Sequence, residues 1–375
     1  MKIFKNGNPI KLVAFFLIVV ALTCMIAFAA SGWQSNEPDA DSGNVGEGGD
    51  KLPSNDESDE NTKGDDPNTN VPVVKPIPAY THYLTGLEIS EEDYYKKAIA
   101  VTISSDAPLY GISSAYLTVE LPTEDGKTRF LLLTNKATSI GKLGSIAPTR
   151  RYISNIAKYF GAILLSYGSD DSFEYDGHDL KYHLDLTQNS GYHYTEYTDY
   201  VYTNADLVNA LLKNTGTATM SSGTPSAPYS FVGYYDNKTI GQETATNITI
   251  SFSSGNSTEL SYSEEDGKFT MSKNSTSKND LLNDRKTQFD NVFVLFSSSV
   301  TYETEESTQT VIDTVDGGKG YYFTQGTKTN ITWSFDQDGN LIFCNEKGEK
   351  LVVNRGSSYI SFVKASRMNE VKIIN

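Results

Sequence analysis

Short apolar runs separated by polar turns dominate the middle of the chain. The runs at 98–103, 114–121 and 128–135 have the length and the flanking turn residues of strands. A further apolar run, "AILLSYGS" at 162–169, is typical of a buried strand. We therefore expect a sheet in this part of the chain.

Helical periodicity appears twice among these strands. In residues 148–160 apolar side chains recur at i, i+3, i+4 and i+7, with Pro148 suited to the first turn and Gly161 to the end. Residues 205–214 predict a second helix, which we expect to start after Thr203 in a capping-box-like manner. Strands and helices together predict a mixed α/β domain.

Beyond residue 228 the helical period disappears and short strand-like runs alternate with Gly, Asp and Asn turns. One exception is a segment at 278–289 that could form a helix. The predicted fold class is α+β, with a mixed α/β domain at 80–225 followed by a mainly antiparallel β domain at 226–375. We place the boundary near residue 225.

Residues 1–30 contain an uncharged apolar run at 12–30, preceded by three lysines. Its length would span a bilayer as a helix, and the lysines favour an inside N-terminus. Three outcomes stay open: a retained single-pass anchor, cleavage after Ala29 that would release a secreted protein, or lipidation at Cys24. In the first case the folded domains lie outside the cytoplasm at the cell membrane.

Residues 31–79 are rich in Ser, Asn, Asp, Gly and Pro. Such a composition buries too little apolar surface to fold, so we expect a disordered acidic linker. Between residues 31 and 70 there are eleven Asp or Glu and two Lys, within a chain of net charge −16. This balance excludes nucleic acid as an expected partner, because phosphate backbones are bound by clustered Lys and Arg.

Several motifs, in order along the chain, resemble the YerB-like bacterial lipoprotein family, domain-of-unknown-function family 3048. They are "YLTGLEISEE" at 83–92, "TRFLLL" at 128–133, "GSIAPTRRY" at 144–152, "AILLSYGS" at 162–169, and "NVFVLF", "GKGYYF" and "GEKLVVNRGSSYISFV" in the second domain. The resemblance implies a tethered extracytoplasmic protein with two domains and no established activity.

The departures from the family pattern concern charged and imidazole positions. The resemblance implies two arginines between Gly144 and Arg150, and here the earlier one is Ala147. It also implies a histidine at Ser166 and another at Asp199, where the family carries His-Asn-Leu-Tyr-Thr. A histidine-dependent activity of the family is therefore not expected in this chain.

Arg150 continues the apolar stripe of the first helix, whereas Arg151 lies on its polar side. An inward arginine at a helix N-terminus opposes the helix dipole and needs an anionic partner. One alternative is an internal carboxylate, Glu120 or Asp125. The other is a carboxylate or phosphate of a ligand, held by Arg150 together with Arg129.

The residues that we expect to bind a ligand are Arg129, Arg150, Ser166, Asp199 and Tyr202. No G-x-S-x-G motif surrounds Ser166 and no histidine is near it in sequence, so we predict no catalytic residue. The three histidines between 175 and 202 lack a compact ligand spacing, so neither a metal nor a cofactor is predicted. The tyrosines of this segment suit either ordinary packing of a loop, which we favour, or stacking on sugars or on a protein surface.

The leading hypothesis is a membrane-anchored binding or scaffolding protein of the bacterial cell envelope, which contacts a cell-wall polymer or envelope proteins. The alternative is an enzyme or solute-binding protein that acts on a wall polymer or an anionic small molecule through a cleft containing arginine. The sequence leaves the ligand and the oligomeric state open.

Overall fold

The computed structural model describes residues 76–169, 182–197, 199–218, 227–303, 308–337 and 340–375. The predicted anchor, the linker up to residue 75 and the predicted boundary near residue 225 lie outside these residues. Within the described ranges no helix combines the length and the hydropathy that a membrane span requires.

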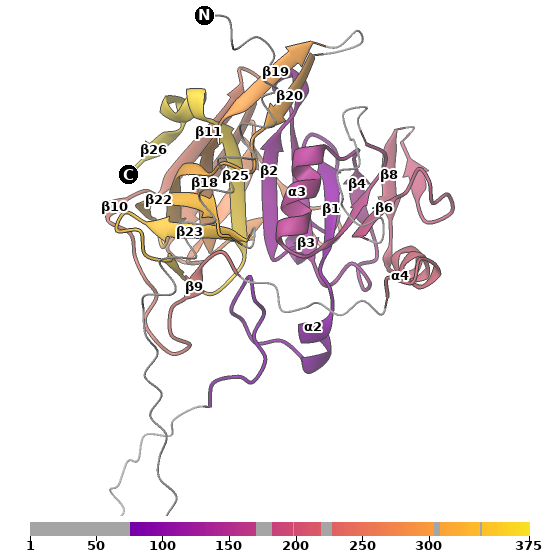
Figure 1. The fold of residues 1–375 in the computed structure, drawn as a ribbon, viewed down its shortest axis with the longest axis horizontal. Coiled ribbons are helices and arrows are strands. Elements are labelled where there is room, and N and C mark those ends of the chain that lie inside the picture. Colours follow the sequence, from indigo (N-terminus) through magenta and orange to yellow (C-terminus); the bar gives the residue numbers. More distant parts are fainter. Residues whose placement is uncertain (1–75, 170–181, 198, 219–226, 304–307, 338–339) are drawn as a thin grey trace, which may run out of the picture. The chain divides into compact units, whose positions relative to one another are not determined.

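The described part of the chain is mostly β, and fourteen of its strands form one large sheet (Figure 1). These strands are β1 (Ile99–Ser104), β2 (Leu117–Pro122), β3 (Thr128–Thr134), β4 (Leu143–Ile146), β5 (Ile163–Ser166), β6 (His183–Asp185), β7 (Tyr194–Glu196), β8 (Tyr200–Thr203), β10 (Glu243–Thr244), β18 (Asn291–Ser297), β21 (Gly318–Thr324), β22 (Thr327–Phe335), β23 (Leu341–Asn345) and β25 (Ser358–Lys364). Their order is β10-β22-β21-β18-β25-β2-β3-β1-β4-β8-β7, with β23 on β22, and with β5 on β1 and β6 on β5. The strand runs expected at 98–103, 114–121, 128–135 and 162–169 are confirmed.

Strand β25 joins the two halves of the sheet. It lies between β18 and β2 and runs parallel to both, with Ser358 opposite Asn291 on one side and Leu117 on the other. Six of its seven residues are buried, as expected for a strand covered on both faces. Strands from the two predicted domains therefore share one sheet, a long-range pairing that local patterns do not reveal.

The second sheet contains β11 (Asn247–Ser253), β12 (Asn256–Ser263), β13 (Lys268–Lys273), β14 (Thr276–Ser277), β17 (Gln288–Phe289) and β26 (Lys372–Ile374). Its inner residues Ile250, Leu260 and Met271 pack in one core with Val101 and Phe130 of the large sheet. Because side chains alternate along a strand, the neighbouring residues of β1–β3 face the opposite core.

That opposite core contains helix α3 (Arg151–Tyr159), which lies along β1–β3 in Figure 1. The predicted stripe Ile153, Ile156, Ala157 and Phe160 is buried, so the first helix is confirmed. Helix α4 (Ala205–Asn214) is also confirmed, but its start differs by one residue. Asn204, rather than Thr203, is the N-cap, and its side chain accepts a hydrogen bond from the Leu207 amide.

The remaining elements are short. They are the helix α2 (Glu91–Tyr95), the 3-10 turns η1 (Ile112–Ser114), η2 (Glu124–Gly126) and η4 (Ala365–Glu370), and the strand pairs β9 (Ser230–Phe231) with β24 (Val352–Val353), β15 (Asn279–Asp280) with β16 (Arg285–Lys286), and β19 (Ser299–Glu303) with β20 (Thr308–Ile312). The β19–β20 hairpin projects from the sheet in Figure 1.

The prediction of a helix at 278–289 is wrong. The segment forms β15, a turn, β16 and β17 instead. The carboxylate of Asp280 accepts hydrogen bonds from the amides of Leu282 and Gly111, each at 2.9 Å. An Asp side chain that binds nearby backbone in this way stabilises a turn in competition with a helix.

Candidate functional site

Arg150 has an internal anionic partner, and that partner is Glu124. Nε of Arg150 lies 3.1 Å from Oε1 of Glu124, and Nη2 lies 2.9 Å from Oε2. The two side chains are 13% and 17% exposed. The prediction that Glu120 pairs with Arg150 is wrong, because Glu120 binds Lys273 instead. The other expected partner, Asp125, lies outside the described side chains. Arg151 is exposed, as predicted.

Arg129 also acts on Glu124. Burial raises the pKa of Glu124, but the hydrogen bonds from Arg150 and the charges of Arg150 and Arg129 outweigh burial, so that the net pKa is lowered. Nη1 of Arg129 donates a 2.6 Å hydrogen bond to the Pro148 carbonyl, which ties β3 to the segment before α3. The carboxylate of Glu124 therefore interacts with both arginines, in the role that one of our alternatives gave to a ligand.

A surface depression of about 360 Å³ lies beside this group. Its walls come from the end of β1, the η2 turn, the start of β3, the segment between β4 and α3, and the residues before β8. Arg129 and Asp199, two of the predicted ligand-binding residues, line it together. Glu124 lines the depression and Arg150 does not. Arg150 instead forms an ion pair with Glu124.

The depression carries charges of both signs. Three carboxylates line it, those of Asp106, Glu124 and Asp199, and two cations, those of Lys127 and Arg129. Hydroxyl groups lie between the charges, contributed by Ser104, Thr123, Thr128, Ser145 and Tyr200. Since Arg150 neutralises Glu124, the remaining charges suit a polar ligand with an amine and a carboxylate better than a polyanion.

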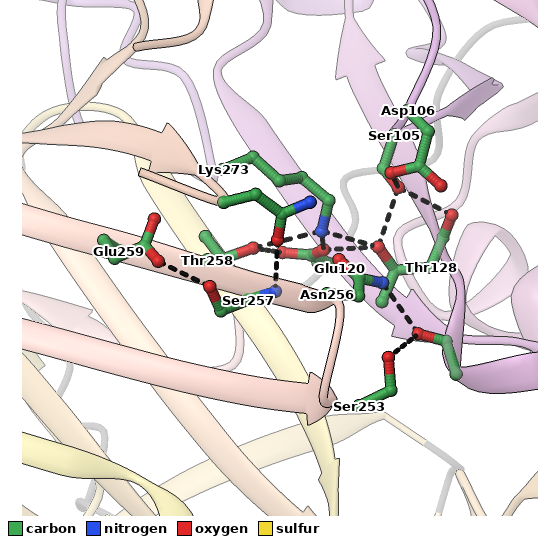
Figure 2. Close-up of polar contacts among 12 residues, drawn as sticks. Ser105, Asp106, Glu120, Thr128, Ser253, Asn256, Ser257, Thr258, Glu259 and Lys273 are labelled. Carbon is green, nitrogen blue, oxygen red and sulfur yellow. Dashed lines mark hydrogen bonds and ion pairs between the residues drawn. The ribbon is translucent and has the colours of Figure 1, made fainter. Parts of the chain in front are cut away.

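A buried polar network, drawn in Figure 2, is connected to the depression through Thr128. Thr128, which lines the depression, donates a hydrogen bond of 2.5 Å to Oε1 of Glu120. The same oxygen lies 2.6 Å from Nζ of Lys273, and the two ionic side chains are 0% and 1% exposed. Ser105 joins the network through the Thr128 hydroxyl at 2.8 Å. The floor of the depression is therefore attached to a buried ion pair.

Two further hydroxyls complete the shell around Glu120. Oε2 accepts a 2.7 Å hydrogen bond from Thr258 and another from Tyr359. Burial, followed by the charge of Glu120, raises the pKa of Tyr359 well above its ordinary value, which keeps this phenol protonated as a donor. The carboxylate thus has four donors from β3, β12, β13 and β25, as a buried charge requires.

Sequence reasoning missed Lys273, although a signal existed. Along β13 the residues Phe269, Met271 and Lys273 are buried, while their neighbours are half-buried. A lysine in the inward phase of a strand indicates a buried partner, because an unpaired ammonium is rarely buried. The identity of that partner, 153 residues away, could not be read from the pattern.

Ser166 has no histidine near it in sequence, but the fold brings His183, 17 residues away, into contact with it. Its Oγ lies 2.9 Å from Nε2 of His183 and 3.0 Å from the Gly168 carbonyl. The parallel pairing of β5 with β6 brings the two residues together, with Leu164 opposite His183. Ser166 is completely buried, so this contact packs the strand end and does not present a nucleophile to a substrate.

Tyr202 is completely buried and does not line the depression. Nζ of Lys142 lies 4.1 Å from its ring centroid and 4.0 Å from that of Tyr110, and pairs with Glu196 at 2.6 Å. Such a cation between two rings stabilises the packing of β4 on β8. Among the described residues no group of three or more His, Cys, Asp or Glu is placed to hold a metal.

Two family models and one solved structure match most of this chain. The model of the "Protein of unknown function (DUF3048) N-terminal domain" matches residues 84–218, and the model of the corresponding C-terminal domain matches residues 248–360. No curated protein matches the chain. The crystal structure of the YerB protein from Bacillus subtilis is similar, with a TM-score of 0.67, 18% identity, and coverage of 79% of this chain and 100% of that chain. The chain therefore belongs to the DUF3048 family of YerB-like proteins of unknown function.

Proposed function

We propose that this protein is a membrane-anchored, non-enzymatic binding protein of the bacterial cell envelope, and that its ligand occupies the Arg129 depression. The anchor is the apolar run at 12–30, which the acidic linker connects to an N-terminal mixed α/β part and a C-terminal β-rich part. The folded parts then lie outside the cytoplasm, where a cell-wall polymer or envelope proteins are the available partners.

One observation carries the binding proposal. Arg129 and Asp199 come from distant parts of the sequence and meet in one depression whose walls are braced from behind by the Arg150–Glu124 pair. A braced wall holds donors and acceptors in place before the ligand arrives, which reduces the entropy lost on binding. The charges of both signs favour a zwitterionic group, such as the peptide portion of a wall polymer.

The alternative of a catalytic cleft receives less support from the geometry. Ser166 and His183 are in contact, but Ser166 is buried and neither residue lines the depression. Arg150 is engaged with Glu124 rather than turned to a ligand. A solute-binding role in the same depression is compatible with both observations, and it is the form of the alternative that we retain.

Cosedimentation of the full-length chain in detergent with purified insoluble cell-wall material tests the proposal. We expect binding that Arg129→Gln and Asp199→Asn each weaken by about tenfold, since a charge-assisted hydrogen bond contributes about 1.5–3 kcal/mol. Lys158→Gln, on the exposed side of α3, is the matched control and should change nothing. Retention of neither wall polymer nor membrane protein, or equal binding by all variants, would contradict the proposal.

Fractionation tests the location independently. The chain should stay with the membrane after washing in high salt, and a protease added to intact cells lacking the wall should digest the folded part. Protection of the folded part from this protease would place it inside the cell and remove the basis for an envelope role.

A further inference from the structure

A second depression, of about 470 Å³, lies at the other end of β1 from the Arg129 depression. Ile99, at the start of β1, lines the second depression, and Ser104, at the end, lines the first. It forms where α2, the start of β1, the segment after β3, the start of β5 and α4 meet, and we call it the α2–α4 groove. Its volume is that of a site for a small molecule or a short polymer segment.

One wall of the groove is an exposed aromatic ring. Tyr95, the last residue of α2, lines the groove and is 52% exposed. Its ring centroid lies 5.2 Å from that of Tyr94 and 6.3 Å from that of Tyr80. These ring contacts hold Tyr95 in place, so a ligand does not have to order it. A fixed tyrosine ring offers a flat apolar face for stacking and a hydroxyl at its edge.

Neutral hydrogen-bonding groups are the second feature of the groove. Asn135, which follows β3, is half-buried; its side-chain amide forms no hydrogen bond with another described residue and stays in contact with solvent. On α4, Asn209 donates a 3.0 Å hydrogen bond through Nδ2 to the Thr138 carbonyl, which leaves its Oδ1 as an acceptor. The groove therefore offers a ligand uncharged donors and acceptors of the amide type.

The charged side chains of the groove already have partners within the chain. Nζ of Lys96 lies 2.8 Å from Glu92 and 3.2 Å from Asp93. Nζ of Lys97 lies 4.5 Å from the centroid of the Tyr182 ring, a cation–π contact. The two lysines and the two carboxylates balance each other, so no net charge selects an anion or a cation. An uncharged ligand suits this lining better than the zwitterionic group that we assign to the Arg129 depression.

Apolar side chains form the recessed part of the groove. Ile99 of β1, Ile163 of β5 and Leu212 of α4 line it and are 4%, 2% and 7% exposed. All three belong to one hydrophobic core, which fixes their positions. A small apolar group of a ligand is removed from water there, whereas a buried polar group would lack a hydrogen-bond partner.

We propose that the α2–α4 groove binds an oligosaccharide of uncharged, N-acetylated sugars. A sugar ring stacks on Tyr95, and the amide of an acetamido group forms hydrogen bonds with the side chains of Asn135 and Asn209. The methyl group of the same acetamido substituent contacts the apolar residues Ile99 and Ile163. This combination of a flat ring, a neutral amide and a small methyl group matches the three features of the lining. The site is additional to the Arg129 depression, with which it shares no lining residue.

Saturation-transfer NMR on the full-length chain, in a detergent without a sugar headgroup, tests the proposal with two probes. One is chitotetraose, an oligomer of N-acetylglucosamine, and the other is cellotetraose, which has the same linkage but no acetamido groups. We expect saturation transfer to chitotetraose that is strongest at the acetamido methyl protons. Cellotetraose should bind about fivefold more weakly or less, because it lacks the amide that Asn135 and Asn209 recognise.

Variants of the lining test the assignment of each residue. Tyr95→Ala and Asn135→Ala should each weaken chitotetraose binding by about fivefold or more, through lost stacking and lost hydrogen bonds. Tyr95→Phe keeps the ring and should stay within about twofold of the wild type. Tyr235→Ala is the matched control, because Tyr235 is 54% exposed but does not line the groove, and it should change nothing. Asn135→Ala keeps the test valid if Tyr95→Ala perturbs α2.

Three results would overturn the proposal: no saturation transfer to chitotetraose, equal binding by wild type, Tyr95→Ala and Asn135→Ala, or binding of cellotetraose as tight as that of chitotetraose. Arg129→Gln should bind chitotetraose as the wild type does, because the two sites share no lining residue. Failure of the α2–α4 groove and failure of the Arg129 depression therefore give different results.

Discussion

Substituting Lys273 by methionine removes one half of the buried ion pair and leaves the other half in place. Glu120 keeps its hydrogen bonds from Thr128, Thr258 and Tyr359, but it loses the only cation within 4.0 Å among the described residues. Its side chain is 0% exposed, so water cannot replace the ammonium. Breaking a buried pair by removing one partner destabilises proteins by about 3–5 kcal/mol, and we expect a loss in this range.

Denaturant unfolding of the full-length chain in detergent, followed by the fluorescence of the buried Trp333, measures this loss. Lys96→Met is the matched control. Nζ of Lys96 lies 2.8 Å from Oε1 of Glu92, a separation close to that of the buried pair. Unlike the buried pair, the side chains of Lys96 and Glu92 are both exposed. Because exposed pairs contribute about 0–1 kcal/mol, the control should lose no more than that.

A double variant separates lost charge from lost packing. In Glu120→Gln combined with Lys273→Met no uncompensated charge is left, so we expect the double variant to be more stable than Lys273→Met alone by about 1–2 kcal/mol. A loss below about 1 kcal/mol for Lys273→Met would refute the reasoning. A double variant less stable than Lys273→Met would refute it as well, because the uncompensated charge would then not be the cause.

Three further predictions concern titration and the buried serine. Burial lowers the pKa of His82 to about 4, so stability should be constant above about pH 6.5 and fall by about 3 kcal/mol as the pH drops to 4; His82→Phe should remove this slope. The lowered pKa of Glu124 contributes stability above its unfolded pKa of about 4.3 that is lost in more acidic solution, and Glu124→Gln should flatten acid unfolding there. Ser166→Ala should lower the free energy of unfolding by about 1–2 kcal/mol and leave wall binding unchanged; a selective loss of binding would contradict a packing role.

Local sequence patterns were sufficient to predict those helices and strands whose own side-chain periodicity marks them. The stripe of α3 and the apolar runs of β1, β3 and β5 follow from side-chain periodicity, and all are present. The predicted helix at 278–289 is wrong because of a long-range contact. Asp280 accepts hydrogen bonds from the backbone amides of Gly111 and Ser113, which are distant in sequence. Helical periodicity could not register a contact between residues about 170 positions apart.

The candidate site shows the same division. Helical periodicity identified Arg150 as a side chain that needs an anionic partner and Arg151 as an exposed side chain. It did not identify Glu124 as that anion, because the choice among nearby acidic residues depends on how η2 folds against the start of α3. Likewise, Arg129 and Asp199 were singled out separately, and only the sheet order β3-β1-β4-β8 brings them to one depression.

Side-chain periodicity was enough to predict the apolar stripe of α3, most of the strands of the N-terminal part, and the family that the chain resembles. Tertiary structure alone decided that β25 would unite the two segments in one sheet and that Lys273 would meet Glu120. The physical reason is that periodicity reports the environment of a side chain, buried or exposed, but not its partner. Partners 26, 17 and 153 residues apart, as for Arg150, Ser166 and Lys273, are selected by strand register and packing.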